Sequence, residues 1–162
     1  MSHRAFIALG SNLQDPAAQV NSALREIAEL PGTRLLRHSS LYRTAPVGYD
    51  NQPDFINAAA EVSTTLQPLA LLRALLALEA RHGRERPFAN APRVLDLDLL
   101  IYDGQVMQTP ELTLPHPRLH ERGFVLFPLA ENAPDLEIPG KGGVSDLVRA
   151  CQDQGMRKMA AR

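Results

Sequence analysis

The chain has 162 residues, 44% of them hydrophobic, and a formal net charge of -1 at pH 7. This length and composition predict one domain, residues 1–162, with its own core, and the single cysteine, Cys151, excludes an internal disulfide framework. The near-neutral charge gives no general attraction for nucleic acid or an anionic membrane, and no apolar run reaches bilayer-spanning length. We therefore expect a soluble cytoplasmic protein that binds anions only through local clusters of basic residues.

The first half of the chain predicts a strand, a helix and two further strands. Residues 5–9 form a short apolar run that ends in a turn signal, as a buried strand does. A proline opens the predicted helix at residues 16–30, which carries apolar residues at helical spacing and stops at a Pro-Gly pair. Residues 34–42 and 55–64 predict the next two strands, and the loop between them is long enough to carry a function.

The second half completes a recognisable order of elements. A leucine-rich stretch predicts a helix over 68–82, and a strand that ends near Tyr102 follows it. The order strand-helix-strand-strand-helix-strand predicts an α+β fold with a ferredoxin-like βαββαβ core and a mainly antiparallel sheet. We expect both helices on one face, with the other face free for a ligand. A C-terminal extension is predicted to begin with a return strand at the sheet edge over 105–107 and a broken helix over 119–132. A closing helix over 144–152 and a frayed end over 154–162 are predicted to follow.

Two carboxylates lie two residues apart in the strand that ends near Tyr102. Residues i and i+2 of a strand share a face, so Asp96 and Asp98 point the same way while the leucines between them face a core. The same face is expected to become apolar again at Leu100 and Tyr102. Carboxylates without nearby sulfur suit a hard cation such as Mg²⁺, which proteins hold with one or two carboxylates plus substrate phosphates. An ordinary strand with a solvated polar face is the alternative interpretation of this short pattern.

Basic and aromatic residues supply the other candidate binding groups. Arg84 lies in a basic segment directly before the acidic strand, and Arg93 precedes the acidic pair; guanidinium groups at such positions suit a polyphosphate. Phe55 and Asn57 share a strand face, so a ring that stacks and an amide that reads a heterocycle edge would be presented together. Phe124 could supply the opposite ring of a sandwich. Ordinary core packing or a solvated loop are the alternative interpretations of these residues.

Several blocks in order along the chain resemble the 6-hydroxymethyl-7,8-dihydropterin pyrophosphokinase family. They are Gly10-Ser11-Asn12, Tyr42 to Gly48, Gln52 to Asn57, Pro92 to Leu100, and Leu114-Pro115-His116 followed by Arg122-Gly123-Phe124. The resemblance runs from about residue 5 to about residue 135. It implies an α+β enzyme of the folate pathway that transfers the diphosphate of ATP, as one unit, to the hydroxymethyl group of the pterin and releases AMP.

The resemblance also implies a role for individual residues. Asp96 and Asp98 would be the ligands of two Mg²⁺ ions, and Arg84 and Arg93 would be catalytic with them as charge stabilisers. The implied ATP contacts are Glu79, Arg84, Arg93, Thr113, His116 and Arg122. The implied pterin contacts are Thr44, Val47, Phe55, Asn57 and Phe124. We expect a monomer whose partners are these two small substrates.

The chain departs from the family at some positions. Phe88 to Ala91 stand where many relatives carry an aromatic residue before the Pro-Arg pair. Leu76 and Glu111 replace polar or basic nucleotide contacts of some relatives, and Pro117 replaces an aromatic residue. The nucleotide pocket is therefore expected to differ more from that of relatives than the acidic pair does.

Two other functions fit part of the pattern. A two-metal nucleotidyltransferase also uses Asp-x-Asp, but that class places Gly-Ser shortly before its acids, whereas Gly10-Ser11 lies far upstream here. A ferredoxin-like RNA-binding module would need aromatic platforms and a basic surface. Aromatic residues make up only 5% of the chain and the net charge is slightly negative, so this alternative is weaker.

Overall fold

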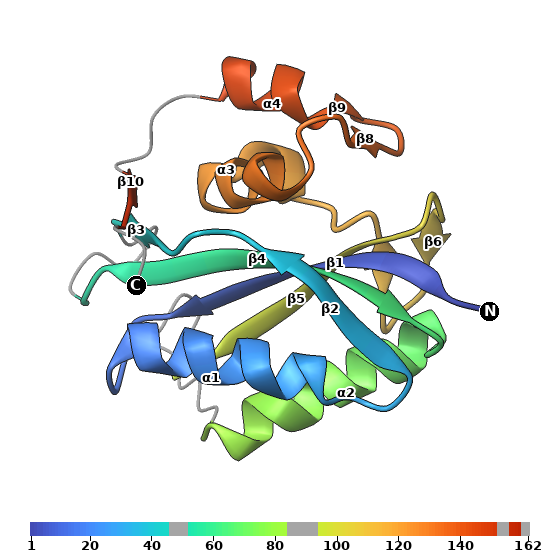
Figure 1. The fold of residues 1–162 in the computed structure, drawn as a ribbon. Helices are drawn as coiled ribbons and strands as arrows, with labels where there is room; N and C mark the ends of the chain where they lie inside the picture. Colours follow the sequence, from blue (N-terminus) through green and yellow to red (C-terminus); the bar gives the residue numbers. More distant parts are fainter. Residues whose placement is uncertain (46–51, 84–93, 152–155, 160–162) are drawn as a thin grey trace.

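The computed structural model of the chain describes residues 1–45, 52–83, 94–151 and 156–159. Its first part confirms the predicted strand-helix-strand-strand-helix-strand order (Figure 1). The elements are β1 (His3–Ser11), α1 (Pro16–Ala28), β2 (Thr33–His38), β3 (Tyr42–Thr44), β4 (Phe55–Thr64), α2 (Pro68–Arg81) and β5 (Asp96–Tyr102).

A C-terminal extension of short elements follows the core. Its elements are β6 (Met107–Gln108), β7 (Thr113–Leu114), the 3₁₀ helix η1 (Leu119–Glu121), α3 (Gly123–Asn132), β8 (Glu137–Ile138), β9 (Gly142–Gly143), α4 (Val144–Ala150) and β10 (Arg157–Lys158). The broken helix and the closing helix predicted from the sequence are both present. Among the described residues, no helix has the length and apolar character needed to cross a membrane.

The main sheet has the strand order β10-β3-β4-β1-β5, and β2 also pairs with β4. Strand β2 pairs with residues 60–64 of β4, whereas β3 pairs with residues 55–57. All of these strand pairs are antiparallel, as predicted. The central strands β1 and β4 are buried on both faces, which explains why they read as nearly continuous runs of apolar and small residues. They form the rigid platform on which the edge strands and the helices are placed.

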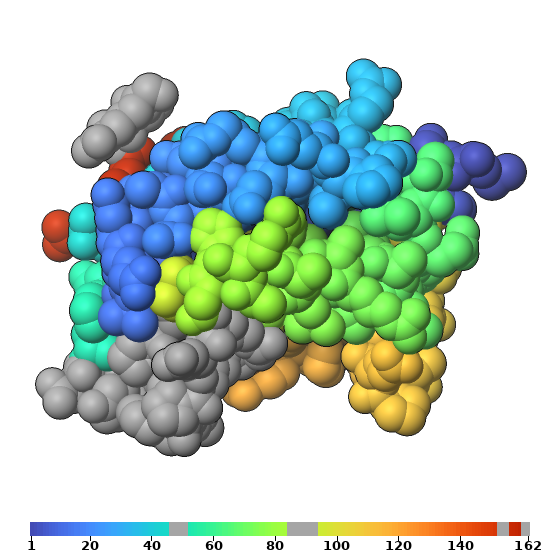
Figure 2. All heavy atoms as spheres, turned by 90° about the horizontal axis from the view of Figure 1, so that it is seen from below, coloured from blue at the N-terminus to red at the C-terminus, as the bar shows by residue number. Residues whose placement is uncertain are grey.

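Helices α1 and α2 cover one face of the sheet. Val20, Leu24 and Ile27 recur at helical spacing and are buried against the sheet. The buried leucines of α2, Leu71, Leu75 and Leu78, join the same cluster. Figure 2 views the molecule from this side, with the blue α1 and the green α2 lying alongside each other. The prediction that both helices share one face is confirmed.

The opposite face is only partly free, so the expectation of an open face is corrected. Helices α3 and α4 pack above it (Figure 1), and Phe6, Leu100 and Leu126 are each at most 1% exposed in a second apolar cluster. The extension therefore supplies a second core, because a strongly apolar patch on the sheet must be covered. Among the described elements, only the end of this face near the start of β5 is left for a site.

A β-bulge separates the acidic part of β5 from its apolar end. Phe6 pairs with Ile101 but Ile7 pairs with Leu99, so Leu100 is the extra residue. Leu100 lies on the face of the acids, as predicted, but Tyr102 packs in the helix-side core. The prediction for Tyr102 is wrong because regular alternation stops at the bulge.

Three further predictions about strands are corrected. The strand expected over 34–42 is broken into β2 and β3, because the hydroxyl of Ser39 replaces a backbone group and accepts the N–H of Ala59 at 2.9 Å. The return strand expected over 105–107 pairs with β7 instead of the main sheet. The C-terminal segment expected to fray contributes β10, which pairs with β3.

Candidate functional site

A cavity of about 1010 Å³ opens at the uncovered end of the α3 face of the sheet. Its floor is built by β1, β4 and β5, and its walls by α2, the β6–β7 hairpin, η1 and the start of α3. The yellow-orange hairpin projects beyond α2 in Figure 2. The volume is at the upper end of the range of small-molecule sites, which leaves room for a nucleotide and a second substrate.

Every predicted site residue that the structure describes lines this one cavity. They come from six separate segments and are Thr44, Phe55, Asn57, Glu79, Asp96, Asp98, Thr113, His116, Arg122 and Phe124. Arg84, Arg93 and Val47 lie outside the described residues, as do Phe88 and Asn90. The two departures Leu76 and Glu111 lie at the cavity wall with Pro117.

The two acids lie side by side on the cavity floor. Asp96 and Asp98 pair in register with Gly10 and Ala8 of β1, and both are half-buried. These partners have small or no side chains, and both acids line the cavity. Two carboxylates that line one cavity offer a hard oxygen donor set, which fits Mg²⁺ and does not fit a metal that requires sulfur.

Glu79 fixes the backbone between the acids. Its side chain comes from the last turns of α2, where the residue is 2% exposed, and its Oε2 accepts the N–H of Leu97 at 2.7 Å. A buried carboxylate that accepts a backbone N–H forms a strong charge-assisted hydrogen bond. Glu79 therefore ties α2 to the strand that presents both acids, a structural role that the sequence did not predict.

His116 presents a neutral hydrogen-bond donor to the cavity. Burial lowers its pKa, and the nearby charges of Arg122 and Arg118 lower it further against the opposing effect of Asp96. Its Nδ1 accepts the backbone N–H of Arg118 at 3.2 Å, so in the neutral ring the proton is assigned to Nε2. A neutral Nε2–H can donate to a phosphate oxygen.

The strand side of the cavity carries the predicted amide and ring. The Nδ2 of Asn57 donates to the Oγ1 of Thr44 at 3.0 Å, and both residues are buried. Phe55 lies on the same strand face, and the opposite wall carries Phe124, whose ring has the guanidinium of Arg122 5.6 Å from its centroid. This arrangement can hold a flat heterocycle between a strand and a helix.

The structure adds Gly10 to the residues that shape the site. A Cβ atom at this position would lie 2.8 Å from the Oδ1 of Asn57, so only glycine leaves the amide in place. The signal in the sequence is a glycine at the end of an apolar run, which by itself indicates a turn. Leu72 and Leu112 also line the cavity, and nothing in the sequence distinguishes them from core leucines.

A family model described as 7,8-dihydro-6-hydroxymethylpterin-pyrophosphokinase matches residues 6–134. The chain belongs to this family. It is 43% identical over 159 residues to the 2-amino-4-hydroxy-6-hydroxymethyldihydropteridine pyrophosphokinase of Pseudomonas aeruginosa, covering 98% of both chains. It is also 43% identical over 155 residues to the enzyme of that name from Haemophilus influenzae, covering 96% of this chain and 97% of the relative.

Solved structures show the same fold. A crystal structure of an HPPK-DHPS protein in complex with substrates has a TM-score of 0.75 to this chain at 11% identity. The match covers 96% of this chain but only 46% of that protein. The chain thus spans less than half the length of this solved relative. The comparison confirms the predicted α+β architecture.

Proposed function

We propose that the cavity is where this chain carries out the reaction of its family, transfer of the diphosphate group of ATP to 6-hydroxymethyl-7,8-dihydropterin with release of AMP. The observation that supports this best is the convergence of two unlike sets of groups on one cavity. The acid pair suits a metal-bound polyphosphate, and the ring and amide on β4 suit a flat heterocycle.

The nucleotide is proposed to lie along the wall formed by α2, the β6–β7 hairpin and η1. Thr113, His116 and Arg122 line the cavity and offer hydroxyl, imidazole and guanidinium donors for this role. Arg84 and Arg93 are proposed, from their place in the sequence, to add positive charge to the triphosphate. Fixed donors of this kind stabilise charge better than water because they need no reorganisation.

Asp96 and Asp98 are the proposed ligands of two Mg²⁺ ions. When bound, the ions would supply charge neutralisation at the phosphate oxygens and a template for in-line displacement. The remaining ligands would come from the substrate and from water, since Mg²⁺ commonly keeps both. Glu79 contributes by holding the backbone of Leu97, which lies between the two acids, at a fixed distance from α2.

The chemical step needs little from the protein besides position and charge. The hydroxymethyl oxygen forms a bond to the β-phosphorus, the bond from that phosphorus to the bridging oxygen of the α-phosphate breaks, and AMP leaves with the electron pair. The hydroxyl proton passes to solvent. Phe55, Phe124 and Asn57 would orient the heterocycle so that its hydroxymethyl group points at the triphosphate, which converts a bimolecular step into one within the complex.

Product analysis tests the reaction class. Purified protein, Mg²⁺, ATP and the pterin are mixed, and AMP, ADP and pyrophosphate are resolved after a fixed time. We expect AMP that appears only with the pterin. Free pyrophosphate with an adenylated acceptor would instead support the nucleotidyltransferase alternative. Cytoplasmic location, a monomeric state and a single catalytic domain over 1–162 stay predictions.

A further inference from the structure

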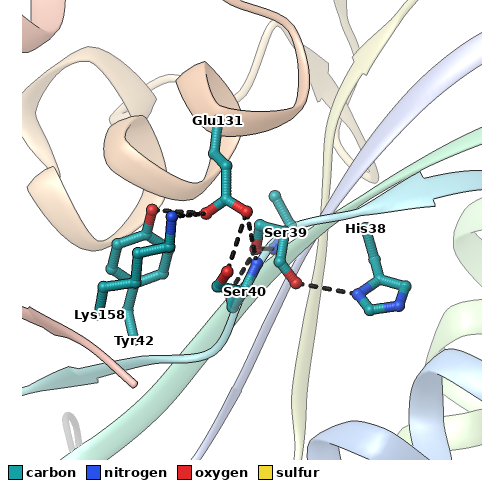
Figure 3. A network of polar contacts seen from close by, with 7 residues as sticks. His38, Ser39, Ser40, Tyr42, Glu131 and Lys158 are labelled. Atoms are coloured by element: carbon teal, nitrogen blue, oxygen red, sulfur yellow. Dashed lines mark hydrogen bonds and ion pairs between the residues drawn. The ribbon is translucent and has the colours of Figure 1, made fainter. Parts of the chain in front are cut away.

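Helix α3 lines the proposed pterin side of the cavity at its N-terminal end and is held by polar contacts at its C-terminal end. Its first turn carries Phe124, which lines the cavity, and its last turn carries Glu131 and Asn132. The side chain of Glu131 points from α3 toward β3 and β10 (Figure 3). The position of the Phe124 wall therefore depends on how the far end of the helix is held.

The carboxylate of Glu131 accepts hydrogen bonds from Ser40, just before β3, and from Tyr42, the first residue of β3. Its Oε2 accepts the N–H and the hydroxyl of Ser40 at 2.9 and 3.0 Å, and its Oε1 accepts the hydroxyl of Tyr42 at 2.7 Å. The ammonium of Lys158 on β10 lies 3.7 Å from the same Oε1. Burial would raise the pKa of Glu131, but the hydrogen bonds from Tyr42 and Ser40 outweigh burial and lower it.

The strand held by Glu131 leads directly to the proposed pterin contacts. Tyr42 is the register partner of Asn57, and Thr44, two residues further along β3, accepts the hydrogen bond of the Asn57 amide. Glu131 thus contacts the strand that orients Asn57, while its own helix carries Phe124. A flat ring fits between two aromatic walls only when they are about 7 Å apart, twice a normal contact distance.

We propose that Glu131 is a positioning residue that sets the gap between the strand wall and the helix wall of the pterin subsite. This inference rests on the proposed function, because it needs the pterin to lie between Phe55 and Phe124. Neutralising the carboxylate loosens β3 against α3, so the pterin binds more weakly. The nucleotide contacts Thr113 and His116 lie outside both elements and keep their places, so nucleotide binding changes less.

The test compares affinities for the two substrates in Glu131→Gln. Calorimetric titration measures the Kd of the pterin in the presence of Mg²⁺ and α,β-methylene-ATP, whose methylene blocks cleavage, and separately the Kd of that analogue. The side chain is 28% exposed, so we expect a modest effect, about fivefold weaker pterin binding with less than twofold change in analogue binding. Tyr42→Phe, which removes one donor and keeps the ring, is expected to show a smaller shift in the same direction.

Two matched controls separate positioning from general loss of stability. Thr33→Val removes the buried hydroxyl contact between Thr33 and Thr64, at 2.8 Å and far from the cavity, and should lower the melting temperature without changing either Kd. Lys158→Gln removes only the longer ion pair and should leave pterin binding within about twofold. Equal loss of both affinities in Glu131→Gln, or no loss of pterin affinity, would overturn the inference. Absence of pterin binding in the unaltered protein would instead overturn the proposed site.

Discussion

The two halves of the α3 face of the sheet use the same strands for opposite purposes. In the covered half, Phe6, Leu100 and Leu126 are packed together with almost no exposure. In the open half, two to four residues away along the same strands, Gly10 and Asp98 border a cavity. A change from large apolar to small or acidic side chains over about 7 to 13 Å is enough to turn a core into a site. Stability and chemistry are thus separated within one sheet.

Removing one of the two acids should abolish most of the activity of the open half without unfolding the covered half. We expect Asp98→Ala, and equally Asp96→Ala, to lower turnover on the order of 10³-fold while the protein stays folded, because the metal-bound triphosphate loses its anchor. Initial rates of AMP formation at saturating Mg²⁺ measure this. The exposed Asp135, which is remote from the cavity, provides the control Asp135→Ala. Near-normal Mg²⁺-dependent rates in either variant would contradict the metal assignment.

Shortening a buried side chain in the covered half should instead lower the stability of the fold. Leu126→Ala is expected to lower the free energy of unfolding by about 2–5 kcal/mol, because it leaves a cavity at a position with 0% exposure. Leu36→Ala, at a leucine that is 46% exposed, should change the free energy of unfolding by under about 0.5 kcal/mol. Urea titration measures both. If Leu126→Ala matched Leu36→Ala, the second core would not contribute as its packing indicates.

Adding one methyl group at Gly10 tests how closely the backbone of β1 must approach the amide of Asn57. Gly10→Ala would place a carbon 2.8 Å from the Oδ1 of Asn57, so the amide must move, and we expect about tenfold weaker pterin binding. Gly104→Ala is the matched control, because a Cβ there meets nothing within 4 Å. Titration with the pterin in the presence of the methylene analogue compares the two. Equal affinities in both variants would show that Asn57 does not hold the heterocycle.

The smallest expected effect is on the pH dependence of stability. His116 has a lowered pKa in the folded protein, so as pH falls through its unfolded value of about 6.5 the unfolded chain takes up a proton that the folded chain does not. Stability is therefore lost on acidification. The difference in unfolding free energy between pH 7.5 and 5.5 should be smaller in His116→Gln. An unchanged difference would mean that His116 titrates alike in both states.

The sequence predicts the core fold well because its signals are local. The alternation around Asp96 and Asp98, the helical spacing of α1 and the order of elements all follow from side-chain period, and all are confirmed. The described residues that the family resemblance assigned to the site also meet in one cavity. Their individual roles stay predictions that the variants above can test.

The sequence misses what depends on distant partners. The break at Ser39 requires Ala59, the inward turn of Tyr102 requires a bulge against β1, and β10 forms only because β3 offers an edge. Gly10 is understood only once Asn57 lies beside it. In each case the deciding neighbour is far away in the chain, so no local pattern can reveal it.

The bulge at Leu100 determines where this strand can change length during evolution. Loss of one residue between Asp98 and Ile101 would restore plain alternation and leave both acids and Tyr102 on their present faces. Loss of Leu97 would instead put Asp96 and Asp98 on opposite faces and divide the metal ligands. Single-residue deletions should thus be tolerated on the C-terminal side of the acid pair and be fatal to activity within it.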